Sequence, residues 1–464
     1  PEITLKRTER GFVTDLVGKA HVGLPFSTPW RTITVADDAG GLLESTMALD
    51  LNAPQAEDPM GEGWKWVRPM KYVGIWWEMH LDKSSWSLWN TDEQGQPIVG
   101  DAHGRHGATT ENTRRYIDFA AAHGFDGVLV EGWNTGWERW IGFDDREGVF
   151  DFVTPYPDYD LRGLAQYALD QGVQLIAHHE TSAAVTTYDA QLDTAYAQMA
   201  ALGQRAVKTG YVGPVIPRGE HHHGQWMVQH YQRSVETAAR HGVAVNIHEP
   251  IKDTGIRRTW PNLMSREGAR GQEFNAWGRN GGNPVDHNAT LAFTRMLAGP
   301  MDFTPGAVHL SLDPWRTANR IPTTLGGQLG LYVVFYSPLQ MACDLPEHYA
   351  SEPLFVDFLE HLAVDWEWTD VRSGEVGEFA VVARQERGGD RVFIGAINAE
   401  TPRTASEPLS FLDRVGHDGR WELLLWEDGP DGIVKTKRTV AATDTLVLEL
   451  AVGGGFAGFA YPAP

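Results

Sequence analysis

Strand-length apolar runs alternate with helical segments between residues 70 and 250, and this alternation constrains the fold more than any other feature. The apolar runs lie at 70–78, 125–134, 173–180, 206–212 and 243–249. The helical segments lie at 111–123, 160–171, 188–202 and 225–241, and each is followed by a glycine, the usual helix stop. Repeated strand–helix–strand units indicate a parallel sheet. With further apolar runs at 299–310 and 331–342, we predict an α/β fold with a (β/α)8 TIM-type barrel; an open doubly wound sheet is the alternative.

The length and spacing of the apolar runs differ on both sides of this region. After about residue 370 the apolar runs are short and separated by Gly, Asp and Pro, which predicts a small C-terminal β domain. Residues 1–64 contain strand-like pieces at 11–17, 30–36 and 45–51, too little chain for a stable sheet domain. We therefore expect a catalytic barrel over 65–368 and a β-sandwich over 369–464, preceded by 1–64 as the C-terminal remnant of an N-terminal β-sandwich.

The amino-acid composition indicates which classes of binding partner fit this protein. The net charge is −22, which disfavours nucleic acid and anionic membranes because both are bound through basic surfaces. No apolar stretch is long enough to span a membrane. The single cysteine, Cys343, excludes internal disulfides and a cysteine-based zinc site. The 18 Trp residues fit core packing or flat surfaces on which sugars stack.

Polar residues gather where the predicted strands end, which is where barrel enzymes carry their active sites. They are Glu78, Glu131, Asn134, His178, His179, Glu180, Lys208, His248 and Glu249, with Glu267 and Glu273 in the loop that follows. Carboxylates at the ends of apolar strands favour a functional role over a core one. Several carboxylates in one pocket suit glycoside hydrolysis or the binding of a hard cation such as Ca²⁺.

Blocks along nearly the whole chain resemble glycoside hydrolase family 97. They are TPW (28–30), VEGWNTGWE (130–138), HHETSA (178–183), VKTGYVGPVIPRGEHHHGQWMVQHY (207–231), HEPIKDTGIRRTWPNLMSREGARGQE (248–273) and FTRMLAGPMDFTPG (293–306). The resemblance implies an N-terminal β-sandwich, a catalytic (β/α)8 barrel and a C-terminal β domain. Retaining members, the α-galactosidases, carry an Asp nucleophile at the end of strand four, whereas inverting α-glucosidases have Gly there. Gly210 stands at that position.

The resemblance also implies roles for individual residues. Glu273 matches the general acid, and Glu249 and Glu180 match the general bases. Glu249, Glu267 and Glu273 match Ca²⁺ ligands, and a fourth glutamate ligand would come from a part of the sandwich that 1–64 does not contain. We expect the substrate to contact the following side chains: Glu131, Trp133, His179, Lys208, His222 and His248.

These inferences predict an exo-acting α-glucosidase that hydrolyses malto-oligosaccharide-like substrates with inversion. A retaining α-galactosidase of the same family and a non-catalytic glycan-binding protein are the alternatives. We expect an oligosaccharide substrate, Ca²⁺ as the cofactor, no nucleic-acid or membrane partner, a monomer, and a periplasmic or secreted location.

Overall fold

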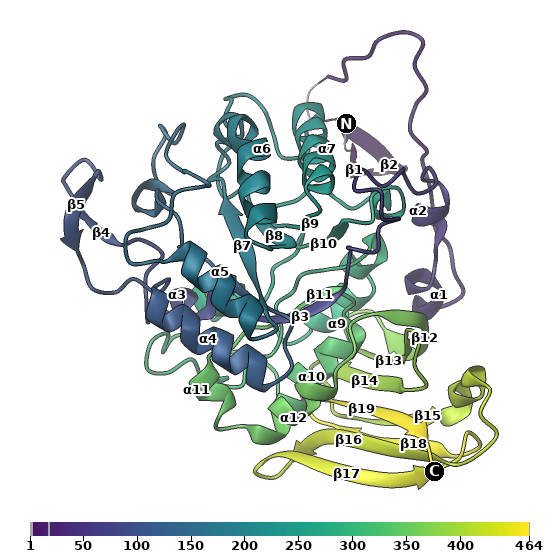
Figure 1. The fold of residues 1–464 in the computed structure, drawn as a ribbon. Coiled ribbons are helices and arrows are strands. Elements are labelled where there is room, and N and C mark those ends of the chain that lie inside the picture. Colours follow the sequence, from purple (N-terminus) through teal and green to yellow (C-terminus); the bar gives the residue numbers. More distant parts are fainter. Residues whose placement is uncertain (1–2, 17–18, 464) are drawn as a thin grey trace.

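A parallel barrel occupies the middle of the computed structural model, which describes residues 3–16 and 19–463 (Figure 1). Its named strands are β3 (Met70–Ile75), β6 (Gly127–Val130), β7 (Gln174–Glu180), β8 (Ala206–Gly210), β9 (Ala244–Ile247), β10 (Leu263–Arg266) and β11 (Leu339–Ala342). They pair in the order β10-β9-β8-β7-β6-β3-β11. The eighth position is taken by residues 301–305, where Asp302 N donates to Arg266 O and Cys343 N donates to Pro305 O. The predicted (β/α)8 fold is confirmed.

The helices between the first strands lie close to their predicted ranges. They are α4 (Thr110–Ala122), α5 (Leu161–Asp170), α6 (Val185–Ala201) and α7 (Gln225–Arg240). The glycines that follow them, Gly124, Gly172, Gly203 and Gly242, all have φ between 67° and 77°. Because such a backbone is cheap only for glycine, each helix ends where the sequence analysis predicts.

Two parts of the strand prediction are wrong. The stretch 248–273, expected to be a loop, contains β10, a four-residue strand in which Ser265 and Arg266 interrupt the apolar pattern. The run 331–342 is the end of α10 (Leu325–Val334) followed by β11, rather than one strand. Helix α10 is buried on nearly all sides because it packs against β14 and β19, and a helix that is apolar all round cannot be told from a strand by its periodicity.

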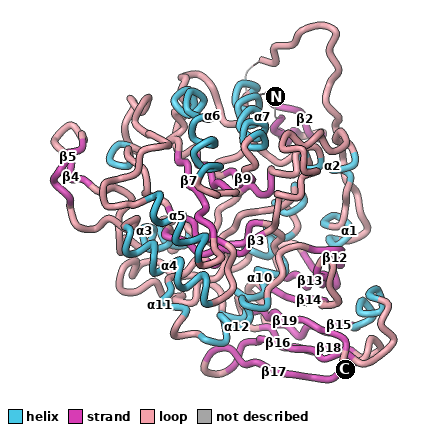
Figure 2. The backbone as a smooth tube through the Cα atoms, viewed as in Figure 1, coloured by secondary structure: helices cyan, strands magenta, loops and turns pink. Residues whose placement is uncertain are grey.

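The C-terminal region is a β domain of two antiparallel sheets. The larger sheet contains β12 (Trp366–Glu375), β13 (Phe379–Glu386), β14 (Val392–Asn398), β19 (Gly455–Pro462), β16 (Trp421–Gly429) and β17 (Gly432–Val440), in that order. The smaller sheet pairs β15 (Arg403–Pro408) with β18 (Thr445–Leu450). Side chains from both sheets, such as Val381, Trp421 and Leu448, share one buried core. Figure 2 shows these strands together below the barrel.

The N-terminal residues form little regular structure. The first two strands, β1 (Ile3–Thr8) and β2 (Gly11–Leu16), pair with each other alone. The expected strand at 30–36 is not formed, and 45–51 contains the short helix α2 (Met47–Asp50) instead of a strand. Helix α1 (Ala39–Leu43) lies against β12, where Glu44 accepts from Val371 N at 2.7 Å. Asn52 Nδ2 donates to Thr254 O at 2.7 Å, so the segment is connected to the barrel as well as to the C-terminal domain.

The remaining elements are short and lie in the connections. The hairpin of β4 (Trp89–Thr91) and β5 (Pro97–Ala102) projects from the barrel, at the left of Figure 1. The other α-helices are α3 (Trp77–His80), α8 (Phe274–Trp277), α9 (His287–Ala292), α11 (Pro346–Tyr349) and α12 (Pro353–His361), and 3-10 turns occur at Trp137–Arg139, Ile256–Arg258, Arg295–Ala298 and Leu409–Val415. Over residues 3–16 and 19–463, no helix combines the length and apolar character that a membrane span needs.

Asp58 organises the turn that leads into the first barrel strand. Its carboxylate accepts hydrogen bonds from the backbone N of Met60, Glu62 and Trp64 and from Trp66 Nε1, at 2.7 to 3.1 Å. Burial acts to raise the pKa of Asp58, but these hydrogen bonds outweigh it and lower the pKa to about 2.

We expect Asp58→Asn to lower the free energy of unfolding by about 2 kcal/mol at pH 7. The amide nitrogen of Asn is itself a hydrogen-bond donor, so it cannot accept from the N–H groups that surround this side chain. A depressed pKa stabilises the fold above the unfolded value of about 3.9 and stops doing so as pH falls through the folded value. Denaturant titrations of both proteins should therefore converge between about pH 4 and pH 2. A difference that stays constant over this interval would contradict the role of the charge.

Candidate active site

A cavity of about 470 Å³ opens at the carboxyl ends of the barrel strands. This volume is within the range of roughly 300–1,000 Å³ that is usual for small-molecule sites. The ionisable residues that line it are His80, Glu131, His178, Glu180, Lys208, His248, Glu249, Glu273 and Arg316. Most of the predicted site residues therefore lie around one cavity.

Tryptophans form much of the cavity wall. The lining includes Trp76, Trp86, Trp137, Trp140 and Trp277. The rings of Trp86 and Trp137 stack with centroids 6.0 Å apart, and Trp137 stacks in turn on His178 at 5.7 Å. Trp277, at 52% exposure, is the most open of these aromatic residues. Flat apolar faces beside ionised groups suit a sugar ring, which is apolar across its face and polar at its rim.

Glu180 and Glu249 each accept a hydrogen bond from the backbone that follows β8. Tyr211 N donates to Glu249 Oε2 at 2.7 Å, and Val212 N donates to Glu180 Oε1 at 3.2 Å. Burial, followed by the charge of Glu249, raises the pKa of Glu180. Burial, followed by the charge of Glu267, raises the pKa of Glu249 to about 7. Because both buried carboxylates have a raised pKa, the pair can accept a proton as a general base.

Glycine at position 210 makes room for this arrangement. A Cβ atom at Gly210 would overlap Glu180 Oε2, so the glutamate occupies the space that a side chain at 210 would take. Glu249 has φ +43°, a conformation that is strained for a residue with a side chain. Such strain is typical of functional sites.

Glu273 precedes α8 and is among the residues that line the cavity. Its Oε2 lies 3.5 Å from His80 Nε2. Burial, followed by the charge of Glu267, raises the pKa of Glu273 to about 8. Burial lowers the pKa of His80 to about 3, so its imidazole is neutral beside the carboxyl group at pH 7. A carboxyl group in this setting keeps its proton near neutral pH, as a general acid must.

Glu131 and Lys208 form a buried ion pair in the cavity wall beside His178, whose pKa burial lowers to about 3. Glu131 Oε1 is 3.1 Å from Lys208 Nζ and 3.2 Å from His178 Nε2, and its Oε2 accepts from Trp86 Nε1 at 2.9 Å. Burial acts to raise the pKa of Glu131, but His178 and Lys208 outweigh it and lower the pKa to about 2. The Glu131–Lys208 pair is therefore ionised at pH 7 and can hydrogen-bond sugar hydroxyls.

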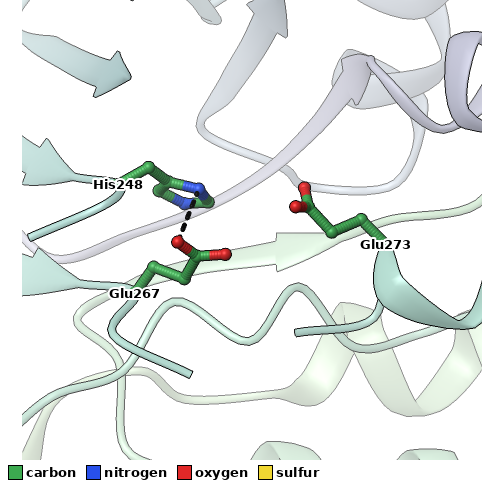
Figure 3. Close-up of side chains that lie close together, drawn as sticks. All are labelled: His248, Glu267 and Glu273. Atoms are coloured by element: carbon green, nitrogen blue, oxygen red, sulfur yellow. Dashed lines mark ion pairs between the residues drawn. The ribbon is translucent and has the colours of Figure 1, made fainter. Parts of the chain in front are cut away.

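His248, Glu267 and Glu273 form a group that could hold a metal ion (Figure 3). Each offers a ligand atom within 4.8 Å of the others, and His248 Nδ1 lies 3.7 Å from Glu267 Oε2. Two carboxylates suit a hard cation such as Ca²⁺, although an imidazole nitrogen is not a ligand that Ca²⁺ prefers. Glu249, predicted as a ligand, is not part of this group, and its Oε2 accepts from Tyr211 N instead.

Three of the predicted substrate contacts are not among the residues that line the cavity, and this corrects the sequence analysis. The side chain of His179 is buried and hydrogen-bonds through Nδ1 to Tyr188 OH at 3.0 Å. Trp133 is buried and donates through Nε1 to His178 O. His222 hydrogen-bonds through Nε2 to Tyr211 O at 2.9 Å. Glu78 and Asn134 also bond within the protein, to Asn112 and to Trp137.

Several residues of the site were not predicted from the sequence. His80, Trp86, Trp140, Trp277 and Arg316 line the cavity. Asp302, a buried residue in the eighth strand position, holds His248 Nε2 at 2.7 Å and Asn246 Nδ2 at 2.6 Å. The position of Asp302 in an apolar run is a signal that the sequence did contain, since an unpaired carboxylate is rarely buried.

Three family models match the chain. The model for Glycoside hydrolase 97 matches residues 76–269, the Glycosyl-hydrolase 97 N-terminal model matches 2–54, and the model for Glycosyl-hydrolase 97 C-terminal, oligomerisation matches 365–459. The description of the C-terminal model does not support the expected monomer.

Relatives and solved structures agree with these matches. A Pseudoalteromonas sp. strain K8 Glycoside Hydrolase Family 97 enzyme in complex with acarbose is 42% identical, with a TM-score of 0.88 over 100% of this chain and 71% of its own. A probable retaining alpha-galactosidase of Streptomyces bingchenggensis is 32% identical, and a retaining alpha-galactosidase of Bacteroides thetaiotaomicron is 27% identical, each over 94% of this chain. The chain spans 58% and 60% of the lengths of these two curated relatives.

Proposed function

The chain belongs to glycoside hydrolase family 97, and from this premise we propose that it is an exo-acting α-glucosidase that hydrolyses malto-oligosaccharide-like substrates with inversion. In this proposal Glu273 protonates the glycosidic oxygen, and Glu249, assisted by Glu180, removes a proton from the attacking water. Glu131, Lys208 and His248 hydrogen-bond the sugar.

The observation that carries the proposal is the pairing of Gly210 with Glu180 and Glu249. A retaining enzyme needs a carboxylate that attacks the anomeric carbon, whereas an inverting enzyme needs room for a water held by a base. Gly210 supplies no side chain, and the two glutamates are each fixed by a hydrogen bond from the backbone that follows it. This arrangement supports a base that activates water.

Relatives support two substrate classes. Family 97 structures from Pseudoalteromonas at 42% identity are in complex with acarbose and with panose, which are α-linked oligosaccharides. The two curated relatives are named retaining alpha-galactosidases, which makes retaining α-galactoside hydrolysis the second candidate. Gly210 favours the first candidate because the resemblance implies an aspartate at this position in the retaining members.

A substrate comparison tests the proposal. We expect kcat/KM for p-nitrophenyl α-glucoside to exceed that for the α-galactoside by at least about 100-fold, since a site that hydrogen-bonds a hydroxyl discriminates strongly against its epimer. Maltotriose should lose glucose from one end. A preference for the galactoside would favour the second candidate, and binding without release of sugar by the wild type would favour a glycan-binding protein.

We further propose that the protein uses Ca²⁺, with Glu267 and Glu273 among its ligands. Both offer carboxylate oxygens in one group. A bound cation there would neutralise part of the clustered negative charge. Glu267 also accepts from Glu249 N at 3.3 Å, so a ligand and a catalytic residue are directly linked.

Chelation is therefore expected to lower activity by about tenfold or more, and added Ca²⁺ should restore it. Added Ca²⁺ should also raise the midpoint of thermal unfolding, because a ligand that binds only the folded state stabilises it. Glu267→Gln should shift both responses to higher Ca²⁺ concentration, whereas exposed Glu111→Gln should not. Activity and stability unchanged after exhaustive chelation would overturn the calcium proposal.

A further inference from the structure

The peptide of residues 210–212 is held from several directions. Its amide groups donate to the two proposed base carboxylates, as described above. Thr181 donates to Gly210 O from its backbone N at 2.9 Å and from Oγ1 at 2.8 Å. His222 Nε2 lies 2.9 Å from Tyr211 O. A shift of this peptide would therefore move both carboxylates together.

The side chain of Tyr211 points away from the cavity and begins a buried chain of hydrogen bonds. Tyr211 OH lies 2.8 Å from His230 Nε2, and His230 Nδ1 lies 2.8 Å from Asp189 Oδ1. Asp189 Oδ2 accepts from Arg233 at 2.7 Å. None of Tyr211, His230 and Asp189 is among the residues that line the cavity.

The direction of each hydrogen bond follows from the chemistry of the groups. Asp189, paired with Arg233, is an acceptor, so His230 Nδ1 carries the hydrogen. Burial lowers the pKa of His230, so Nε2 keeps its lone pair and accepts from Tyr211 OH. The row of hydrogen bonds from Tyr211 to Asp189 therefore has a single order of donors and acceptors. It fixes the tyrosine ring in one orientation.

Helix α7 supports both halves of the base arrangement through consecutive residues. His230 holds the 210–212 peptide through Tyr211, and Tyr231 OH donates to Glu249 O at 2.9 Å. The strained backbone of Glu249 is thus held at its carbonyl by the same helix that orients Tyr211.

We propose that Tyr211, His230 and Asp189 are positioning residues that set the relative placement of the Glu180 and Glu249 carboxylates by fixing the 210–212 peptide. This inference rests on the base roles given to Glu180 and Glu249 in the proposed function. Catalytic rates are sensitive to such placement, since a displacement of about 1 Å can lower a rate by about 100-fold.

Tyr211→Phe removes only the hydroxyl group that joins the peptide to His230. We expect kcat to fall about tenfold, with KM within twofold, and with equal losses for activated and unactivated leaving groups because proton removal from water is impaired. Amide hydrogen exchange in a fragment covering 208–214 should become faster. Asp189→Asn should cause a smaller loss, and adding it to Tyr211→Phe should cost little more, because both changes break the same chain.

Tyr196→Phe is the matched control. Tyr196 is also fully buried, and its hydroxyl bonds to Tyr188 OH and Ser234 Oγ between the same two helices, at 3.1 and 2.9 Å. It should lose similar thermal stability while kcat and exchange in 208–214 stay unchanged.

Equal behaviour of the two phenylalanine variants in both kcat and exchange would overturn the positioning role and leave a packing role. The exchange measurement does not depend on activity. If Glu249→Gln leaves the wild-type rate unchanged while Tyr211→Phe still speeds exchange, the proposed base role of Glu249 is wrong, but the link between the Tyr211 hydroxyl and the 210–212 peptide stands. If Tyr211→Phe leaves exchange unchanged, that link is itself overturned.

Discussion

Replacing Glu273 by glutamine is expected to lower kcat for malto-oligosaccharides by about 10³-fold, because the amide cannot donate the proton that the glycosidic oxygen needs. The cavity position of Glu273 and its raised pKa support this role. Substrates with good leaving groups, such as 2,4-dinitrophenyl α-glucoside and α-glucosyl fluoride, should lose much less because they need little protonation.

Steady-state kinetics with a series of leaving groups provide the measurement. Glu111→Gln, an exposed substitution in the first turn of α4, is the control for the removal of one carboxylate. Equal losses for maltotriose and for the fluoride would contradict the acid role of Glu273. The assays should be run at saturating Ca²⁺, so that a weakened metal site does not mimic the loss of the acid.

The barrel could be predicted from the sequence because its early units are regular. Each combines a short apolar run with an amphipathic helix and a glycine stop, and all three signals agree over residues 111–242. The prediction weakens after residue 250, where β10 has four residues and the eighth strand position is an irregular segment with an isolated bridge at Met301. Those units depend on contacts made across the barrel, which local patterns do not record.

The prediction of site residues from the sequence was wrong where a side chain faces away from the cavity. Successive side chains on a strand point to opposite faces, so His178 and Glu180 reach the cavity while His179 points outward to Tyr188. The adjacent pair His248 and Glu249 departs from this alternation, and both line the cavity where the backbone takes φ +43°. Arg316 comes from a loop and Trp277 from the four-residue helix α8, and no periodicity predicts the position of either.

Glu249→Gln is expected to lower kcat by about 10³-fold for every leaving group, including fluoride, because water must lose a proton however readily the leaving group departs. This independence separates the base from the acid, since Glu273→Gln should spare the activated substrates. If Glu249→Gln lowers kcat for maltotriose but not for α-glucosyl fluoride, the base role of Glu249 is contradicted.

The stereochemistry of the wild-type reaction follows from the same assignment. Water that is activated by Glu249 and Glu180 must attack from the face opposite the leaving group, so an α-glucoside should release β-glucose first. A covalent intermediate would give α-glucose and needs a carboxylate about 5–5.5 Å from the acid. Gly210 cannot supply that carboxylate, and Glu180, whose Oε1 accepts from Ser182 N at 2.6 Å and from Val212 N, is the residue that could. Time-resolved proton NMR of the anomeric signals distinguishes the two: α-glucose before mutarotation would make Glu180 the nucleophile and favour the retaining mechanism of the curated relatives.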